Sequence, residues 1–220
     1  MVTQPWGKNA LGSAERDWRH AIERRPRMRH LLLRAQAWWD AQRFDQPEWH
    51  LAAWPDQKVR HIQLHVAKAL GKVVAALDRG VGAASGIDPM ARVRDEVLPD
   101  VAIYRSQLIN TLREGGVPTA SRFRPHARVP SRSAADPLFR VAMSLSRASA
   151  QLAGYIEPRE HGAMSPVSSI QEAIQDLHDS AEALATYFAV DLASAHQARL
   201  EALLGAPLPA SLIERGREAP

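Results

Sequence analysis

The chain has 220 residues and a formal net charge of +4 at pH 7, and 45% of its residues are hydrophobic. It can bury a substantial core, and its lack of cysteine excludes disulfides, thiol catalysis and cysteine-ligated metal sites. No apolar run approaches the ~20 residues of a membrane span, and residues 1–18 hold no apolar signal core. These features predict a cytoplasmic protein that does not enter a membrane.

Charge is unevenly distributed along the chain. Residues 1–147 carry 24 basic and 14 acidic side chains, whereas residues 148–220 carry 4 and 10. The asymmetry indicates either a basic half that meets phosphate groups, including those of nucleic acid, or two halves that attract each other.

Helical periodicity is strong and strand signals are weak throughout. Apolar spacing and capping residues predict helices over 13–43 with a break near Pro26, 57–79, 91–114, 137–157, 169–189 and 192–204. Asp191 is predicted to cap the last helix. Pro99 is predicted to kink the third helix or to delay its start.

Proline and glycine mark the connections between these helices. Residues 44–56 and 80–90 are predicted to be loops, and residues 115–136 hold three prolines and four arginines, a composition typical of a linker. The expected organisation is an N-terminal repeat unit, a linker, a C-terminal repeat unit and a tail: 1–114, 115–136, 137–206 and 207–220.

A pattern of polar and apolar positions returns after 79 residues. One helical stripe is basic in the first half and recurs at the same spacing in the second: His61, His65, Lys68, Lys72, then Arg140, Ser144, Arg147, Gln151. The helix after each stripe carries two carboxylates one turn apart: Glu96 with Asp100, and Glu172 with Asp176. We therefore expect an all-α fold, whose four-helix-bundle core is made of two repeated helix pairs with additional N-terminal and C-terminal helices.

This arrangement resembles the MazG-like family of all-α nucleoside triphosphate pyrophosphatases. The similar segments are AWWDAQRFDQPEW (37–49), HVAKALGKVVAALDRG (65–80) and DEVLPDVAIYRSQLINTL (95–112), with the motif helices repeated at 140–156 and 170–201. The resemblance implies Mg²⁺ held by carboxylates of both motif helices and cleavage of a nucleoside triphosphate to a monophosphate and pyrophosphate. It also implies a monomeric pseudo-dimer or a homodimer.

The carboxylates of the first family motif are missing from this chain. Basic, apolar or amide side chains stand in their places: Lys68, Ala69 and Lys72 in the first half, Arg147, Ala148 and Gln151 in the second. A lysine ammonium has no lone pair to donate and repels a cation. We therefore expect the ordinary magnesium site to be lost, so that a rearranged metal site would have only these ligands: Glu96, Asp100, Glu172, Asp176.

The basic stripe has four alternative interpretations. Lys68 and Lys72 pair with the carboxylates in place of a metal ion, or the stripe simply faces solvent. Alternatively it binds a phosphorylated ligand through candidates His61, His65, Lys68, Lys72 and Arg147. In the fourth interpretation His61 and His65, one turn apart, bind a transition metal together with Glu96 and Asp100.

Aromatic side chains near the N-terminus are the remaining candidates. Four tryptophans either stack on a base or form core beneath a loop: Trp38, Trp39, Trp49, Trp54. The leading hypothesis is a catalytically degenerate MazG-like module without a cofactor that binds a nucleotide or a protein partner. The alternatives are an active Mg²⁺-dependent pyrophosphohydrolase with a rearranged site, and a nucleic-acid-binding protein acting through the basic half.

Overall fold

A computed structural model describes residues 31–41, 54–78, 88–114 and 136–209. Within these ranges every regular element is a helix and no strand occurs, which confirms the all-α prediction. None of the described helices has the length and apolar character needed to cross a membrane. The predictions for residues 13–30, for Trp49 and its loop, for the linker before Asp136 and for the last residues lie outside the described ranges.

The described helices run in chain order as follows: residues 31–41, α2 (Trp54–Leu77), α3 (Pro89–Arg92), the π-helical η3 (Val93–Val97), α4 (Leu98–Glu114), α5 (Pro137–Glu160), α6 (Val167–Phe188) and α7 (Leu192–Leu204). The last helix has the predicted bounds, and the side chain of Asp191 caps it by accepting a hydrogen bond from the backbone N–H of Ser194. α5 continues through Pro158, where the prediction ended it.

The third predicted helix is interrupted by a π-helical turn just before Pro99. Residues Val93–Val97 form this wider turn, and the backbone N–H of Leu98 donates to the carbonyl of Val93. Proline lacks an N–H, and its ring clashes with the carbonyl four residues earlier in a regular α-helix. The wider turn removes this conflict, so the helix continues into α4 without ending.

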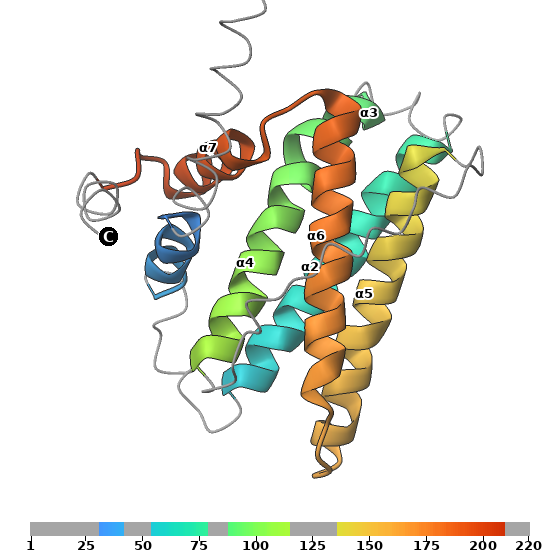
Figure 1. Cartoon of the computed structure of the whole chain (residues 1–220), viewed down its shortest axis with the longest axis vertical. Coiled ribbons are helices and arrows are strands. Elements are labelled where there is room, and N and C mark those ends of the chain that lie inside the picture. The colour runs from blue at the N-terminus through green and yellow to red at the C-terminus, as the bar shows by residue number, and fades with distance from the viewer. Residues whose placement is uncertain (1–30, 42–53, 79–87, 115–135, 210–220) are drawn as a thin grey trace, which may run out of the picture.

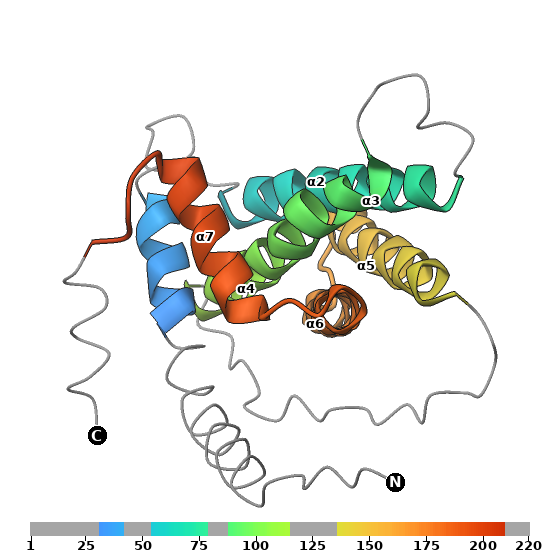
Figure 2. The same ribbon diagram turned by 90° about the horizontal axis from the view of Figure 1, so that it is seen from above.

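Four helices enclose the main hydrophobic core. α2, α4, α5 and α6 lie beside one another (Figures 1 and 2), and the core draws fully buried side chains from each of them: Ile62, Leu108, Leu145, Leu177. Since α2 and α4 precede the predicted linker and α5 and α6 follow it, both halves of the chain contribute to one core.

A smaller second cluster holds the helix at 31–41 and α7 against the outer side of α4. Its buried residues are Ala35, Ile103, Leu200 and Leu208. Figure 2 shows these two helices side by side, outside the four that enclose the main core. The segment η3–α4, which carries Glu96 and Asp100, therefore lies between α2 and α7.

Removal of the α7 cap is expected to weaken this outer layer. Asp191→Ala loses the hydrogen bonds that the carboxylate accepts from the N–H and hydroxyl of Ser194, which should cost about 1 kcal/mol. Chemical denaturation followed by circular dichroism measures the loss, and Asp191→Asn is expected to retain most of the stability. Equal losses in both variants would contradict the capping role.

Candidate functional site

Lys72 and Glu96 form the first contact between the basic stripe and the acidic helix. Lys72 Nζ lies 2.5 Å from Glu96 Oε2, and Arg92 Nε lies 3.4 Å from the same oxygen. The hydrogen bond from Lys72 is the main reason that the pKa of Glu96 lies below its ordinary value. The ammonium of Lys72 thus balances the negative charge of Glu96.

Asp100 pairs with a residue that the sequence analysis did not single out. Arg199 of α7 donates from Nε to Asp100 Oδ1 at 2.8 Å and from Nη2 to Oδ2 at 3.4 Å. The two residues are 99 positions apart, so no local spacing links them. Arg199 would have been a candidate partner of Asp100 if the sequence had predicted that α7 lies against α4.

Glu96 and Asp100 have partners on different helices, although residues four apart in a helix lie nearly on one face. The segment that carries them packs between two neighbours, since η3 contacts α2 and α4 contacts both α2 and α7. Glu96 meets α2, whereas Asp100 meets α7.

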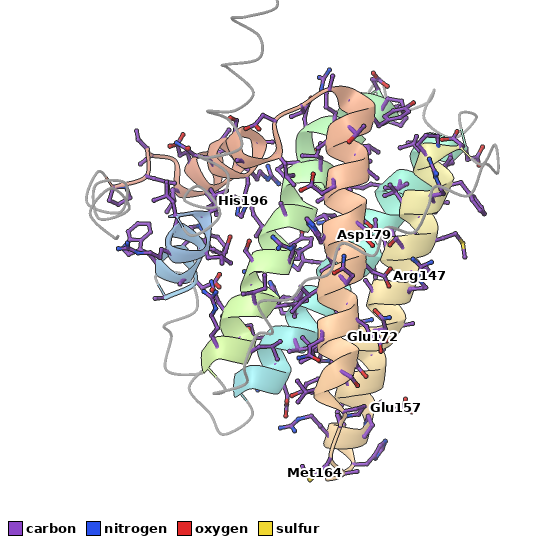
Figure 3. All side chains as sticks on the ribbon, in the orientation of Figure 1. Arg147, Glu157, Met164, Glu172, Asp179 and His196 are labelled. Atoms are coloured by element: carbon purple, nitrogen blue, oxygen red, sulfur yellow. The ribbon has the colours of Figure 1, made fainter. Side chains whose placement is uncertain are left out.

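The carboxylates of α6 are also engaged by side chains of a neighbouring helix, α5. Arg147 Nη2 lies 2.7 Å from Asp176 Oδ1 and Arg147 Nε lies 3.3 Å from Oδ2, while the hydroxyl of Ser144 donates to Asp176 Oδ1 at 2.9 Å. Gln151 Nε2 donates to Glu172 Oε2 at 3.2 Å. Figure 3 labels Arg147 on α5 and Glu172 on α6, two helices that lie side by side. Here both carboxylates meet the same neighbouring helix, α5.

The four carboxylates are therefore engaged separately by side chains of this chain. Their donors are Lys72, Arg199, Gln151 and Arg147. Within the described ranges, no group of three or more histidine, aspartate or glutamate side chains is placed to hold a metal ion. The hydrogen-bond donors around Glu96, Asp100, Glu172 and Asp176 are three cationic side chains and one amide. These surroundings do not fit a divalent metal ion, which needs oxygen ligands and is repelled by positive charge.

The first residues of the basic stripe have different surroundings. Lys68 is exposed and forms no ion pair within the part of the chain that the structure describes. His61 and His65 are half-buried, and their ring centroids are 4.4 Å apart. The Tyr104 hydroxyl lies 3.3 Å from His65 Nδ1. Neither histidine joins Glu96 and Asp100 in a metal cluster.

A buried polar network near the N-terminal helix was missed by the sequence analysis. Asp40 Oδ1 accepts hydrogen bonds from Gln36 Nε2 at 2.8 Å and from Gln107 Nε2 at 2.9 Å, and Asp40 Oδ2 lies 3.3 Å from Lys58 Nζ. The Lys58 and Asp40 side chains are only 2% and 4% exposed. His196 of α7 (labelled in Figure 3) lies 3.4 Å from Gln36. The i, i+4 spacing of Gln36 and Asp40 was the only local signal.

Of the four tryptophan candidates, the structure describes the side chains of two, Trp38 and Trp39. Trp38 and Trp39 are half-buried, and Trp39 packs against the second hydrophobic cluster, as expected of core. Trp54 begins α2, but its side chain lies outside the described set, as does the whole of Trp49.

Comparison with models of known protein families gave no match to this chain, and curated proteins and solved structures gave none either.

Proposed function

We propose that the chain is a catalytically degenerate, tandem MazG-like protein that serves as a binding module. In this proposal the α2 and η3–α4 helices correspond to α5 and α6, and internal donors have replaced the magnesium ion in each pair. The observation that carries the proposal is the engagement of all four second-motif carboxylates by donors from the same chain: Glu96, Asp100, Glu172, Asp176. An active pyrophosphohydrolase would need these oxygens for a metal ion.

A protein partner is favoured over a nucleotide. Lys72 and Arg147, two of the phosphate-binding candidates, are already paired with carboxylates. α2 and α5 also expose large hydrophobic side chains, and two of them, Phe139 and Met143, are one turn apart on α5. Neighbouring exposed apolar groups are typical of protein contact surfaces. If the protein binds a nucleotide and the Arg147→Ala variant does not, the ligand is a nucleotide and the preference for a protein partner is wrong.

Hydrolysis assays test the loss of catalysis. The purified protein is expected to release no pyrophosphate from any nucleoside triphosphate in the presence of Mg²⁺ or Mn²⁺. Hydrolysis that disappears in the Glu96→Ala variant would overturn the proposal, because Glu96 would then be a working metal ligand.

Restoring a carboxylate tests whether Lys72 replaces a metal ion. Lys72→Glu places a second carboxylate beside Glu96 and is expected to reduce the free energy of unfolding by about 2 kcal/mol, which lowers the Tm by ~4–8 °C. Millimolar Mg²⁺ should recover much of this loss, because the ion would bind both carboxylates.

Lys72→Met is the matched control for this experiment. It removes the same ammonium without adding a carboxylate, so Mg²⁺ is expected to leave its Tm unchanged, as in the wild-type protein. Stabilisation of the wild type by Mg²⁺, or equal responses of Lys72→Glu and Lys72→Met, would contradict the replacement.

A further inference from the structure

We propose that His61 and His65 form a two-imidazole binding site for a transition-metal ion of the Zn²⁺ class, with water completing the coordination. The site is separate from the four carboxylates discussed above and does not depend on the proposed function. Imidazole nitrogen is a preferred ligand of Zn²⁺, and histidines at i and i+4 of one helix are a recognised arrangement for it.

The two rings are close enough to share one ion. Both histidines project from the same face of α2, their ring centroids are 4.4 Å apart, and their planes are inclined by 50°. Each side chain is only half-buried, so that water and ions reach this face. The pair lies on a 24-residue helix, which holds the two rings in position better than a loop would.

Tyr104 and Asp100 favour the histidine tautomer that binds a metal. The Tyr104 hydroxyl lies 3.3 Å from His65 Nδ1, and burial together with the negative charge of Asp100 raises the pKa of Tyr104. Because this negative charge holds the hydroxyl proton on Tyr104, we assign the proton shared with His65 to Nδ1, so that the hydroxyl oxygen accepts the Nδ1–H. The Nε2 atom of His65 then carries the lone pair. Metal-binding histidines are commonly oriented by such an outer carboxylate and hydroxyl.

Burial and neighbouring charges lower the pKa of both histidines. Burial is the main cause that lowers the pKa of each histidine below 6.5, and the positive charges of Lys68 and Lys72 lower the pKa of His65 further. Asp40 opposes the shift at His61 and Asp100 opposes it at His65. The neutral ring is the form that binds a metal, so the direction of these shifts favours binding.

Among the described residues, the charged groups that act on the pKa values of the pair come from three elements. Lys68 and Lys72 are on α2, Asp100 is on α4, and Asp40 is in the helix at 31–41. Lys72, Asp100 and Asp40 each lie beside a residue of opposite charge, namely Glu96, Arg199 and Lys58. Lys68, which forms no ion pair within the described residues, is the remaining cation and opposes metal binding. Its removal is therefore expected to strengthen the site.

Titration of the full chain with Zn²⁺ alone, followed by long-range ¹H–¹⁵N NMR of the imidazoles, tests the proposal. The metal-free spectrum should show His65 protonated on Nδ1, and the His61 and His65 signals should change first as Zn²⁺ is added. His61→Ala and His65→Ala are each expected to reduce the affinity at least ~10-fold, and Tyr104→Phe by ~10-fold. Lys68→Gln should raise it.

The matched control is His161→Ala, which removes an exposed histidine from the turn after α5. This variant is expected to bind Zn²⁺ as the wild type does. The proposal is overturned if the His61 and His65 signals do not respond, or if His161→Ala loses as much affinity as His65→Ala. Circular dichroism spectra that match the wild type establish that each variant is folded, so that a loss of affinity reports the site.

Discussion

Asp40→Ala is expected to reduce the free energy of unfolding by about 3 kcal/mol, a large fraction of the stability of an ordinary domain. The substitution removes the acceptor of the hydrogen bonds from Gln36 and Gln107. It also leaves the Lys58 ammonium, which is 2% exposed, buried without this carboxylate. Removing a buried acceptor is costly because its donors do not regain water in the folded protein. Urea denaturation measures the loss.

Two further variants separate this effect from a general sensitivity to substitution. Asp40→Leu combined with Lys58→Met removes both charges and is expected to recover most of the lost stability. Glu160→Ala breaks the Arg60–Glu160 pair, whose side chains are 63% and 45% exposed, and should change stability by no more than about 0.5 kcal/mol. A double variant as unstable as Asp40→Ala would show that shape, and not charge, dominates at this position.

Acidification is expected to destabilise the protein through His196. Burial, with a smaller contribution from the positive charge of Arg105, lowers the pKa of His196 to about 4 from the ordinary value of 6.5. The unfolded chain therefore binds a proton more readily than the folded chain. The stabilising contribution is complete above pH ~6.5 and is lost as the pH falls toward 4, to a total of about 3 kcal/mol.

The His196→Gln variant isolates this contribution. Glutamine retains a hydrogen-bonding group toward Gln36 but does not titrate. Denaturation curves measured between pH 7 and pH 4 should show a smaller loss of stability in the variant, by about 3 kcal/mol. The two proteins should differ by a constant amount above pH 7. His61 and His65 are present in both proteins and contribute equally to both curves. Parallel curves over the whole range would therefore contradict the assignment of the loss to His196.

Local periodicity was sufficient to predict most of the described helices. α7 begins at Leu192 because Asp191 caps it, and the apolar faces of α2, α5 and α6 identify them as helices that pack on one core. The π-helical turn was not predicted, although Pro99 indicated a disturbance there. A proline lacks the N–H that would donate to the carbonyl four residues earlier. The helix can respond by kinking, by starting later or by forming a wider turn, and the sequence pattern does not distinguish these outcomes.

The candidate contacts were predictable only where the partners lie on consecutive helices. Lys72 and Glu96 are 24 residues apart, and their pairing was one of the alternatives that the stripes allowed. Arg199 and Asp100 are 99 residues apart, and Asp40 and Gln107 are 67 apart. These pairings depend on how α7 and the N-terminal helix lie against α4, which no local spacing reveals.

The ion pairs between helices also constrain how the sequence can change over evolutionary time. A carboxylate at position 96 and an ammonium at position 72 stabilise each other, so loss of either one leaves the other without its partner. The same holds for positions 100 and 199 and for positions 147 and 176. In sequences that descend from a common ancestor with this chain, we expect the residues of each pair to vary together. Positions that change together in an alignment of such sequences would then identify these contacts without a structure.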